Sequence, residues 1–283
     1  MPRLAALETS ILKLLFLIDV KANYHTHSTW CDGVDTPEVI AEAAVQAGFD
    51  VLGFSSHAMF PESCYDWVVS AGNIESYMKD LRALAERFKG TLKILCGVEA
   101  DYVREESAPD RALFSSYGVD YIIGSVHLVR ADDGALVPVD ASPESLMAGI
   151  RDHFSGNAEA FVRAYFQQER EMLSSFDFDI AGHLDLVRKF NSRHPYFDES
   201  ASWYLKELEL TAEAAAKAGR IVEVNTGAIS RGWLDDAYPS KSFREILRSC
   251  GVKFVLNSDA HSSSALDCAF DRFADAEEYI FLP

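Results

Sequence analysis

The sequence predicts an α/β fold in which a mainly parallel sheet is covered by helices. Seven short apolar runs alternate along the chain with segments of helical length and pattern. This alternation is typical of parallel sheets, because each return to a parallel strand needs a crossover that is usually a helix. Six of the seven runs end on histidine, glutamate or aspartate. The ends of parallel strands in a barrel share one rim, where active sites lie, so we expect these distant side chains to converge.

The first half of the chain is predicted to carry four of the strands. An apolar run at 14–18, continued by a short link at 19–23, leads directly to the first histidines. A helix is expected over 37–47, because Thr36 can cap it, proline suits its first position and Gly48 can end it. The other elements predicted here are strands at 51–55, 92–98 and 119–126 and helices at 74–88 and 110–117.

The second half continues the alternation without an obvious boundary. Two long loops, at 58–72 and 128–143, are expected to shape the substrate pocket, since loops of this length are often functional. No linker or shift in composition divides the chain, so we expect one domain over 1–283, with residues 1–20 as a lead-in segment. The remaining predicted elements are strands at 178–182, 221–224 and 252–256, helices at 157–175, 199–218 and 240–250, and a closing helix with edge packing over 270–281.

The composition argues against several classes of partner. A net charge of -18 does not suit the nucleic-acid backbone, which needs clustered lysine and arginine. The five cysteines form no Cys-x-x-Cys pair, which favours reduced thiols in a cytoplasmic protein. The apolar stretch at 11–18 is interrupted by Lys13 and is far shorter than the ~20 residues of a membrane span. We therefore expect neither a nucleic-acid nor a membrane partner, and a lead-in helix rather than a signal peptide.

Two histidines at positions 25 and 27 open the predicted site. In an extended segment, side chains two residues apart point to the same face, so His25 and His27 can bind one ion together. Such a pair is a weak signal, since a lone histidine is more simply a hydrogen-bonded core residue. The pattern is stronger here because six of the chain's eight histidines lie at predicted strand ends. The full set is His25, His27, Asp32, His57, Glu99, His127, His183, Asp259 and His261.

This set is too large for a single ion, because zinc sites with an open position typically use three protein ligands. We expect two or three divalent ions that share a bridging carboxylate, and zinc, manganese and iron all suit mixed imidazole and carboxylate ligands. Such ions lower the pKa of a bound water toward about 7 and can clamp the oxygens of a phosphoryl group. Hydrolysis of a phosphate ester is therefore the first expectation, and amide hydrolysis is the second.

Short motifs surround these residues. They are His-Thr-His followed by Cys-Asp-Gly, then Gly-Phe-Ser-Ser-His, Gly-Val-Glu-Ala-Asp-Tyr, Ile-Gly-Ser-Val-His, Gly-His-Leu-Asp-Leu, Asn-Thr-Gly-Ala and Asn-Ser-Asp-Ala-His. Over residues 20–275 they resemble the PHP (polymerase and histidinol phosphatase) superfamily, and its histidinol-phosphate phosphatase branch in particular. The resemblance implies a distorted (β/α)7 barrel with a trinuclear metal site at the C-terminal ends of its strands. It also implies a phosphomonoester hydrolase that converts L-histidinol phosphate to L-histidinol and phosphate in histidine biosynthesis.

The resemblance further divides the nine side chains among three ions, with Glu99 bridging the first two. Some members of the superfamily have histidine where this chain has Asp32, which leaves the identity and occupancy of the third ion open. The implied ligands are His25, His27, Glu99 and Asp259 for the first ion, Glu99, His127 and His183 for the second, and Asp32, His57 and His261 for the third.

The phosphate also needs cationic partners in addition to the metals. The resemblance points to Arg188 and Arg231, whose planar guanidinium groups suit phosphate oxygens. With Asp259 and His261 they form the implied catalytic set. Surface salt bridges are the alternative role for both arginines.

Several other residues have more than one expected role. Asp185 either orients His183 or joins a salt bridge. The proton for the leaving alkoxide could come from Asp101 or from a metal-bound water, and Lys189 and Arg193 are weaker candidates for contact with the phosphate. The remaining candidates are four loop acids that could attract a substrate ammonium or simply face solvent, Glu62, Asp66, Asp132 and Asp133, and two histidines expected to be structural or exposed, His153 and His194.

Other functions remain as alternatives to the histidinol phosphatase. The nearest is a PHP phosphoesterase that acts on nucleotide or sugar phosphates. A metal-dependent deacylase would leave Arg188 and Arg231 without a role. A polymerase-associated nuclease should show further domains or a basic groove, and a scaffold without catalysis would not need a complete set of ligands. The sequence does not indicate which oligomeric state the protein has.

Overall fold

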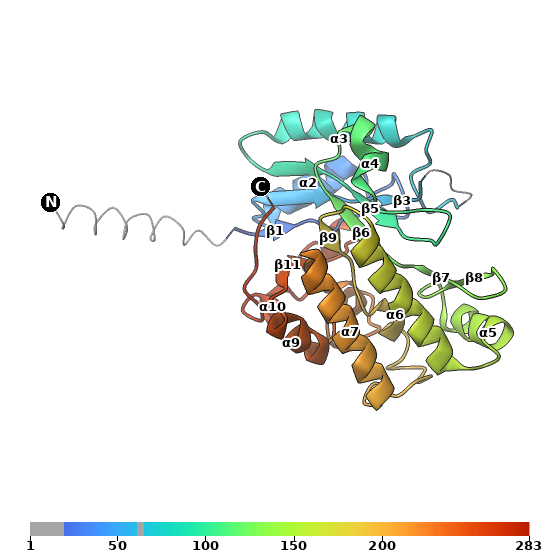
Figure 1. Cartoon of the computed structure of the whole chain (residues 1–283). Coiled ribbons are helices and arrows are strands. Elements are labelled where there is room, and N and C mark those ends of the chain that lie inside the picture. The colour runs from blue at the N-terminus through green and yellow to red at the C-terminus, as the bar shows by residue number, and fades with distance from the viewer. Residues whose placement is uncertain (1–19, 61–64, 283) are drawn as a thin grey trace, which may run out of the picture.

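The computed structural model describes residues 20–60 and 65–282. The predicted first run at 14–18 and the loop acid Glu62 lie outside the described residues. Figure 1 shows the strands gathered centrally, with the helices around them. The longer helices are α2 (Pro37–Gln46), α3 (Ile74–Phe88), α5 (Pro143–His153), α6 (Ala158–Ser175), α7 (Ser202–Ala218) and α9 (Lys241–Ser249), and the short ones are α4 (Arg111–Phe114), α8 (Gly227–Ser230) and α10 (Phe270–Phe273).

The prediction of a mainly parallel sheet is confirmed. A three-stranded parallel sheet is formed by β1 (Ala22–Asn23), β2 (Val51–Phe54) and β4 (Lys93–Cys96). A six-stranded parallel sheet has the order β11 (Lys253–Asn257), β10 (Ile221–Asn225), β9 (Ile180–Ala181), β6 (Ile122–Ser125), β5 (Val98–Asp101) and β3 (His57–Ala58). The neighbours in each sheet are joined through helices or long connections, as parallel pairing requires.

Short interruptions join the two sheets. Residues 55–56 separate β2 from β3, and Gly97 alone separates β4 from β5. Gly97 has no space for a side chain, because an added Cβ would lie 2.5 Å from the ring of Tyr121. At the other edge, Thr26 forms a parallel bridge with Ala260, which follows β11. The segments that carry the predicted site residues are therefore brought next to one another.

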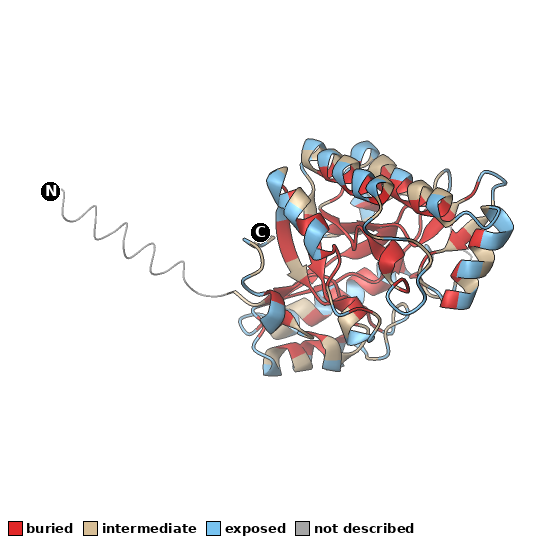
Figure 2. Ribbon diagram, turned by 90° about the horizontal axis from the view of Figure 1, so that it is seen from below, coloured by how far each residue is buried: buried red, intermediate tan, exposed pale blue. Residues whose placement is uncertain are grey.

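An aromatic core lies beneath these segments. The Tyr121 hydroxyl shares its proton between the carbonyls of Tyr24, which follows β1, and Phe54, which ends β2. Ile180 and Val255 pack in the same buried cluster. Figure 2 shows the sheet interior as buried, whereas the helices alternate between buried inner faces and exposed outer faces. This is the pattern expected when each helix buries one apolar stripe against the sheet.

The loop prediction over 128–143 is wrong, and the prediction for the tail is right only in part. The loop predicted over 128–143 contains an antiparallel hairpin of β7 (Leu128–Arg130) and β8 (Leu136–Pro138) and leads into α5, which was not predicted. The closing helix predicted over 270–281 ends at Phe273. Beyond it the Ile280 amide donates to the Phe254 carbonyl at 2.9 Å, so the tail follows β11 as extended chain and satisfies its backbone groups there.

The strand ends also differ in detail from the prediction. His57 and Glu99 lie within the continuation strands β3 and β5, paired directly across from each other, rather than just after a strand. His183, Asp259 and His261 do follow strands, as predicted. Within the described ranges, no helix is both long and apolar enough to cross a membrane.

Candidate metal centre

The His-x-His pair follows β1 and points into the centre of the rim. The Nδ1 atom of His25 lies 2.8 Å from Oε2 of Glu223, so the opposite ring nitrogen, Nε2, faces Glu99 Oε2 at 3.0 Å. The Nε2 atom of His27 lies 3.3 Å from Asp259 Oδ1 and 3.4 Å from Glu99 Oε2. The two histidines thus converge on the same two carboxylates, although these lie on strands far apart in the sequence.

Glu99 occupies the middle of the cluster and is fully buried. Its Oε1 atom accepts a hydrogen bond of 2.6 Å from Ser125 and lies 3.0 Å from Nε2 of His183. Its Oε2 atom lies 3.0 Å from Nδ1 of His57, and His127 Nε2 is 3.6 Å from Oε1. A carboxylate with imidazoles around both oxygens has the position expected of a bridging ligand.

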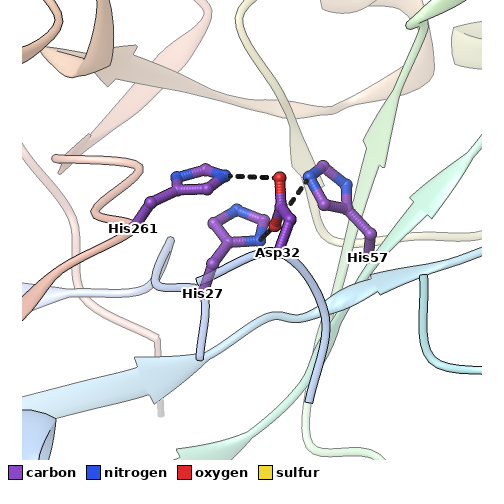
Figure 3. Close-up of side chains that lie close together, drawn as sticks. All are labelled: His27, Asp32, His57 and His261. Carbon is purple, nitrogen blue, oxygen red and sulfur yellow. Dashed lines mark hydrogen bonds and ion pairs between the residues drawn. The ribbon is translucent and has the colours of Figure 1, made fainter. Parts of the chain in front are cut away.

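A second group, drawn in Figure 3, contains the more exposed residues of the cluster, Asp32 and His261. His261 Nε2 lies 3.1 Å from Asp32 Oδ2, and His57 Nε2 lies 3.8 Å from Asp32 Oδ1. His27 reaches the same carboxylate through Nδ1, at 3.7 Å. The ligand atoms of these four residues all lie within 4.8 Å of one another. The structure therefore brings all nine predicted ligands into one contiguous cluster.

The donor atoms fit divalent ions. Buried polar atoms are normally hydrogen-bonded, and each unpaired one is unfavourable by about 1–3 kcal/mol. Several ring nitrogens and carboxylate oxygens here have no partner with hydrogen-bond geometry among the described residues, namely His25 Nε2, His27 Nε2, His57 Nδ1, Glu99 Oε2, Asp101 Oδ2 and His183 Nδ1. Bound cations would satisfy such atoms.

The same atoms also define the possible groupings of ligands. Among the residues that the structure describes, four sets of ligand atoms are compact enough to hold an ion: His27, Asp32, His57 and His261; His25, Glu99 and His183; His25, His27 and Asp259; and His57, Asp101 and His127. They overlap the three predicted ligand sets without coinciding with them, so the division among ions stays a prediction.

The electrostatics keep the carboxylates and His27 in the forms that bind metals. Burial by itself raises the pKa of Glu99, but the imidazoles of His25 and His57 lower it well below its usual range. The pKa of Asp259 is likewise held well below its usual range, because Arg231 and His25 outweigh the effect of burial. Burial lowers the pKa of His27 to about 3, together with the charges of neighbouring histidines. The carboxylates are thus ionised and His27 is neutral, as metal ligation requires. At His25, His57 and His127 burial lowers the pKa, but the neighbouring carboxylates outweigh it and raise the pKa above its usual range, so these rings would release a proton when a metal binds.

Glu223 is a site residue that the sequence analysis missed. Its Oε2 atom contacts His25 Nδ1 and accepts from the Asn257 amide, both at 2.8 Å. Its Oε1 atom accepts from the backbone amide of His183 at 2.8 Å and from the Asn225 side chain at 2.7 Å. Glu223 therefore fixes two ligand segments at once. A glutamate in the middle of the apolar run 221–224 was the signal that could have revealed it.

Asp101 and Asp185 have structural contacts that narrow their predicted roles. Asp101 is buried, and its Oδ1 atom lies 2.5 Å from Nδ1 of His127, so it orients that ring as Glu223 orients His25. Asp185 accepts from the Ser240 amide at 2.8 Å and lies 3.4 Å from Arg188 Nη1. Of the two roles expected for Asp185, these contacts are those of a salt bridge.

A cavity of about 450 Å³ opens above the cluster. Arg231 lines it, and its Nη2 atom lies 3.2 Å from Asp259 Oδ1 and 2.8 Å from His261 Nδ1. Lys189 lines it as well. Arg188 is not among the lining residues, because its Nε atom donates to Glu199 Oε2 at 2.6 Å and the side chain is buried.

The other weaker candidates lie outside the cavity lining. Arg193 stacks on Trp233, with the guanidinium carbon 5.4 Å from the ring centroid. His153 pairs with Asp133 on the surface at 2.8 Å, in agreement with its expected structural role. The other exposed residues of this group are Asp66, Asp132 and His194.

Comparison with known proteins supports the expected family. A protein from Deinococcus radiodurans named probable histidinol-phosphatase is 28% identical over 262 residues, which are 90% of this chain and 91% of that protein. The histidinol-phosphatase of Bacillus subtilis is 25% identical over 267 residues, covering 90% of this chain and 98% of its own. The solved histidinol phosphate phosphatase of Lactococcus lactis, complexed with zinc, L-histidinol and phosphate, has a similar fold, with a TM-score of 0.59 and 20% identity over 86% of this chain and 87% of that one.

The family assignment comes from the sequence pattern of the PHP domain. That pattern matches residues 23–227, which include the His-x-His pair, Glu99, His127 and His183. This range is well over half of the chain. The chain belongs to the PHP domain family.

Proposed function

We propose that this protein is a metal-dependent phosphomonoester hydrolase that releases phosphate from L-histidinol phosphate, a step of histidine biosynthesis in the cytoplasm. The observation that carries the proposal is the cluster of buried imidazole nitrogens and carboxylate oxygens beside a cavity lined by Arg231, several of which have no partner with hydrogen-bond geometry in the described part of the chain. The relatives from Deinococcus radiodurans and Bacillus subtilis, both named as histidinol-phosphatases, support this substrate. The Lactococcus lactis protein, solved with histidinol and phosphate, has the same fold.

The proposed ligands would hold two or three divalent ions, with Glu99 as the bridging carboxylate. Zinc in the Lactococcus lactis protein supports zinc as one choice, and manganese and iron fit the same ligands. When bound, such ions supply an ionised water at neutral pH and neutralise the charge of phosphoryl oxygens. Glu223 and Asp101 keep the ring nitrogens of His25 and His127 aimed at the cluster.

Arg231 is proposed to bind the phosphate from the protein side. Its guanidinium is held in place by Asp259 and His261, which are themselves proposed ligands and members of the catalytic set. An arginine fixed in this way can donate parallel hydrogen bonds to phosphate oxygens with little further loss of freedom. Arg188 contacts Asp185 and Glu199. It would act either by holding the segment beside the cavity in place or by leaving these partners to reach the phosphate.

We also propose that the strands close into a distorted seven-stranded barrel within a single catalytic domain. Counting β2 with β3 and β4 with β5 as interrupted single strands gives seven, in chain order around the sheet. Closure is supported by two hydrogen bonds beyond β1 and β11, from the His27 amide to the Ala260 carbonyl at 2.8 Å and from the Ala260 amide to the His25 carbonyl at 3.2 Å.

The test is phosphate release from L-histidinol phosphate, measured against a panel of sugar phosphates and nucleotides with manganese- or zinc-loaded protein. The proposal expects a strong preference for histidinol phosphate that is lost on chelation and restored by metal. Comparable release from several phosphates would instead indicate a phosphoesterase of broad specificity. No release from any of them by protein with bound metal would overturn the phosphatase assignment.

A further inference from the structure

One carboxylate in the cavity has no role in the proposed metal centre. Asp32, Asp140 and Asp259 are the acids that line it within the described residues, and the first and last are proposed ligands. Asp140 lines the cavity from the segment that follows the β7–β8 hairpin, and it is not among the proposed ligands. An acid in the wall of a phosphate-binding cavity repels the phosphate, so its presence calls for a positive group on the substrate.

Lys189 fixes the position of this acid. The Lys189 ammonium donates to the Asp140 backbone carbonyl at 2.8 Å and to Oδ2 at 3.0 Å. The Lys189 side chain is largely buried, with 12% of its surface exposed, whereas that of Asp140 is 31% exposed. The second oxygen, Oδ1, accepts no hydrogen bond from any described residue and is free to accept one from a ligand.

The charge of Asp140 is secure at neutral pH. Burial raises the pKa of its carboxyl, but Lys189 and His127 more than offset this and bring the pKa to about 2. The acid therefore stays ionised at neutral pH beside the Lys189 side chain. The wall presents this pair of opposite charges beside Arg231, the proposed phosphate ligand.

We propose that Asp140 is a specificity residue that binds the ammonium group of the leaving alcohol. This inference rests on the proposed function. In L-histidinol phosphate the ammonium is carried by the carbon next to the one that bears the phosphate ester, so both charges lie within a few bonds. The Lys189–Asp140 pair carries the opposite charges in the same close spacing. Its cation can face the phosphate and its anion can face the ammonium.

The rest of the wall suits the remainder of such a substrate. Trp67 and Tyr65 line the cavity and pack against each other, with ring centroids 5.5 Å apart. Leu136 and Pro138, from the same hairpin region as Asp140, line it as well. An aromatic and apolar wall beyond a single anion fits an aminoalkyl chain that ends in a flat ring. The loop acids expected to attract the ammonium, Asp66, Asp132 and Asp133, are exposed and do not line the cavity.

The experiment compares two substrates, L-histidinol phosphate and 3-(imidazol-4-yl)propyl phosphate, which lacks only the amine. With metal-loaded wild-type protein, kcat/KM should be about ten- to a hundredfold higher for histidinol phosphate than for the analogue without the amine. A hydrogen bond between charged groups changes an equilibrium or rate by a factor of about this size. Asp140→Asn should remove most of this ratio, whereas Asp140→Glu, which keeps the charge, should retain more of it. Asp133→Asn, an exposed acid outside the cavity, should leave the ratio as in the wild type.

The ratio separates recognition from a structural role. If Asp140 only held Lys189 in place, Asp140→Asn and Lys189→Met would slow both substrates equally, and an unchanged ratio in Asp140→Asn would overturn the inference. Equal turnover of the two substrates by the wild-type protein would overturn it as well, whether or not any variant folds. In both cases the phosphatase assignment would stand. No release from either substrate by metal-loaded wild-type protein would overturn the proposed function, and the inference with it.

Discussion

Replacement of Glu223 by glutamine tests whether the metal centre depends on a residue that lies outside its ligand set. Both Glu223 oxygens accept two contacts, from His25 and Asn257 on one side and from the His183 amide and Asn225 on the other. A glutamine side chain keeps one oxygen and puts an NH₂ group in place of the other. In two of the four contacts the new NH₂ group would then face another hydrogen-bond donor. No water can relieve this, because Glu223 is fully buried.

The expected size of the effect follows from these contacts. Hydrogen bonds to a charged group contribute about 1.5–3 kcal/mol each, and loss of one member of a buried charged network reduces stability by about 3–5 kcal/mol. Glu223→Gln should therefore lower the free energy of unfolding by about 3–5 kcal/mol in the metal-free protein. The His25 ring also loses the partner that fixes its orientation, and losses of this kind weaken metal binding by about 10–100-fold.

The assay is urea denaturation of the metal-free protein together with a titration of zinc against a competing chelator. Glu213→Gln is the matched control, because Glu213 lies on the exposed face of α7 and surface changes of this kind usually shift stability by less than about 0.5 kcal/mol. If Glu223→Gln bound zinc as tightly as the control, the argument that Glu223 orients the ligands would be refuted.

Three further predictions follow from the same structure. Gly97→Ala should lower the free energy of unfolding by about 1–3 kcal/mol, because the added Cβ would meet the Tyr121 ring at 2.5 Å. Gly72→Ala is the control and should not lower it, because nothing lies within 4 Å of the added Cβ there. Equal midpoints of urea denaturation for the two variants would contradict this prediction. Burial raises the pKa of Glu169 well above its usual range. Below about pH 4.3 the carboxyl is protonated in both the folded and the unfolded state, and the stability that this proton supports is lost as the pH rises through the raised pKa of the folded state. Glu169→Gln should therefore gain stability relative to the wild type at pH 8 compared with pH 5, and a constant difference in urea denaturation would contradict the argument. Arg231→Met should raise KM for histidinol phosphate at least about tenfold, and an unchanged KM would remove Arg231 from the phosphate site.

The helices and the convergence of the site could be predicted because their causes are local or follow from topology. The α2 helix begins where Thr36 caps it, with the Val39 amide donating to its side chain at 3.4 Å. The α5 helix begins in the same way at Ser142 and Pro143, so its omission was a missed signal rather than a limit of the sequence. Convergence of the histidines needed only the rule that parallel strands end at one rim.

The remaining features depend on packing between distant segments. A glutamate in the apolar run 221–224 indicates a buried acid, but the neighbouring residues do not show whether Glu223 faces the metal centre or a helix. Both faces of a parallel strand are buried, so the alternation of apolar residues carries no information on this point. Arg188 and Lys189 are neighbours in sequence, yet one pairs with Glu199 and the other lines the cavity. Asp140 could not be distinguished from the exposed loop acids for the same reason, because the hairpin that places it was not predicted.

The most direct test of the account is a stoichiometric metal titration of the chelated protein, with phosphate release from L-histidinol phosphate measured at each point. Bound ions per chain would be counted by mass spectrometry of the same samples. The account predicts that the rate rises with occupancy and reaches its maximum at two or three ions per chain, with His57→Ala reducing both numbers. Full activity at less than one ion per chain, or activity that survives removal of all ions, would contradict the proposal that the histidine and carboxylate cluster carries out the reaction through bound metals.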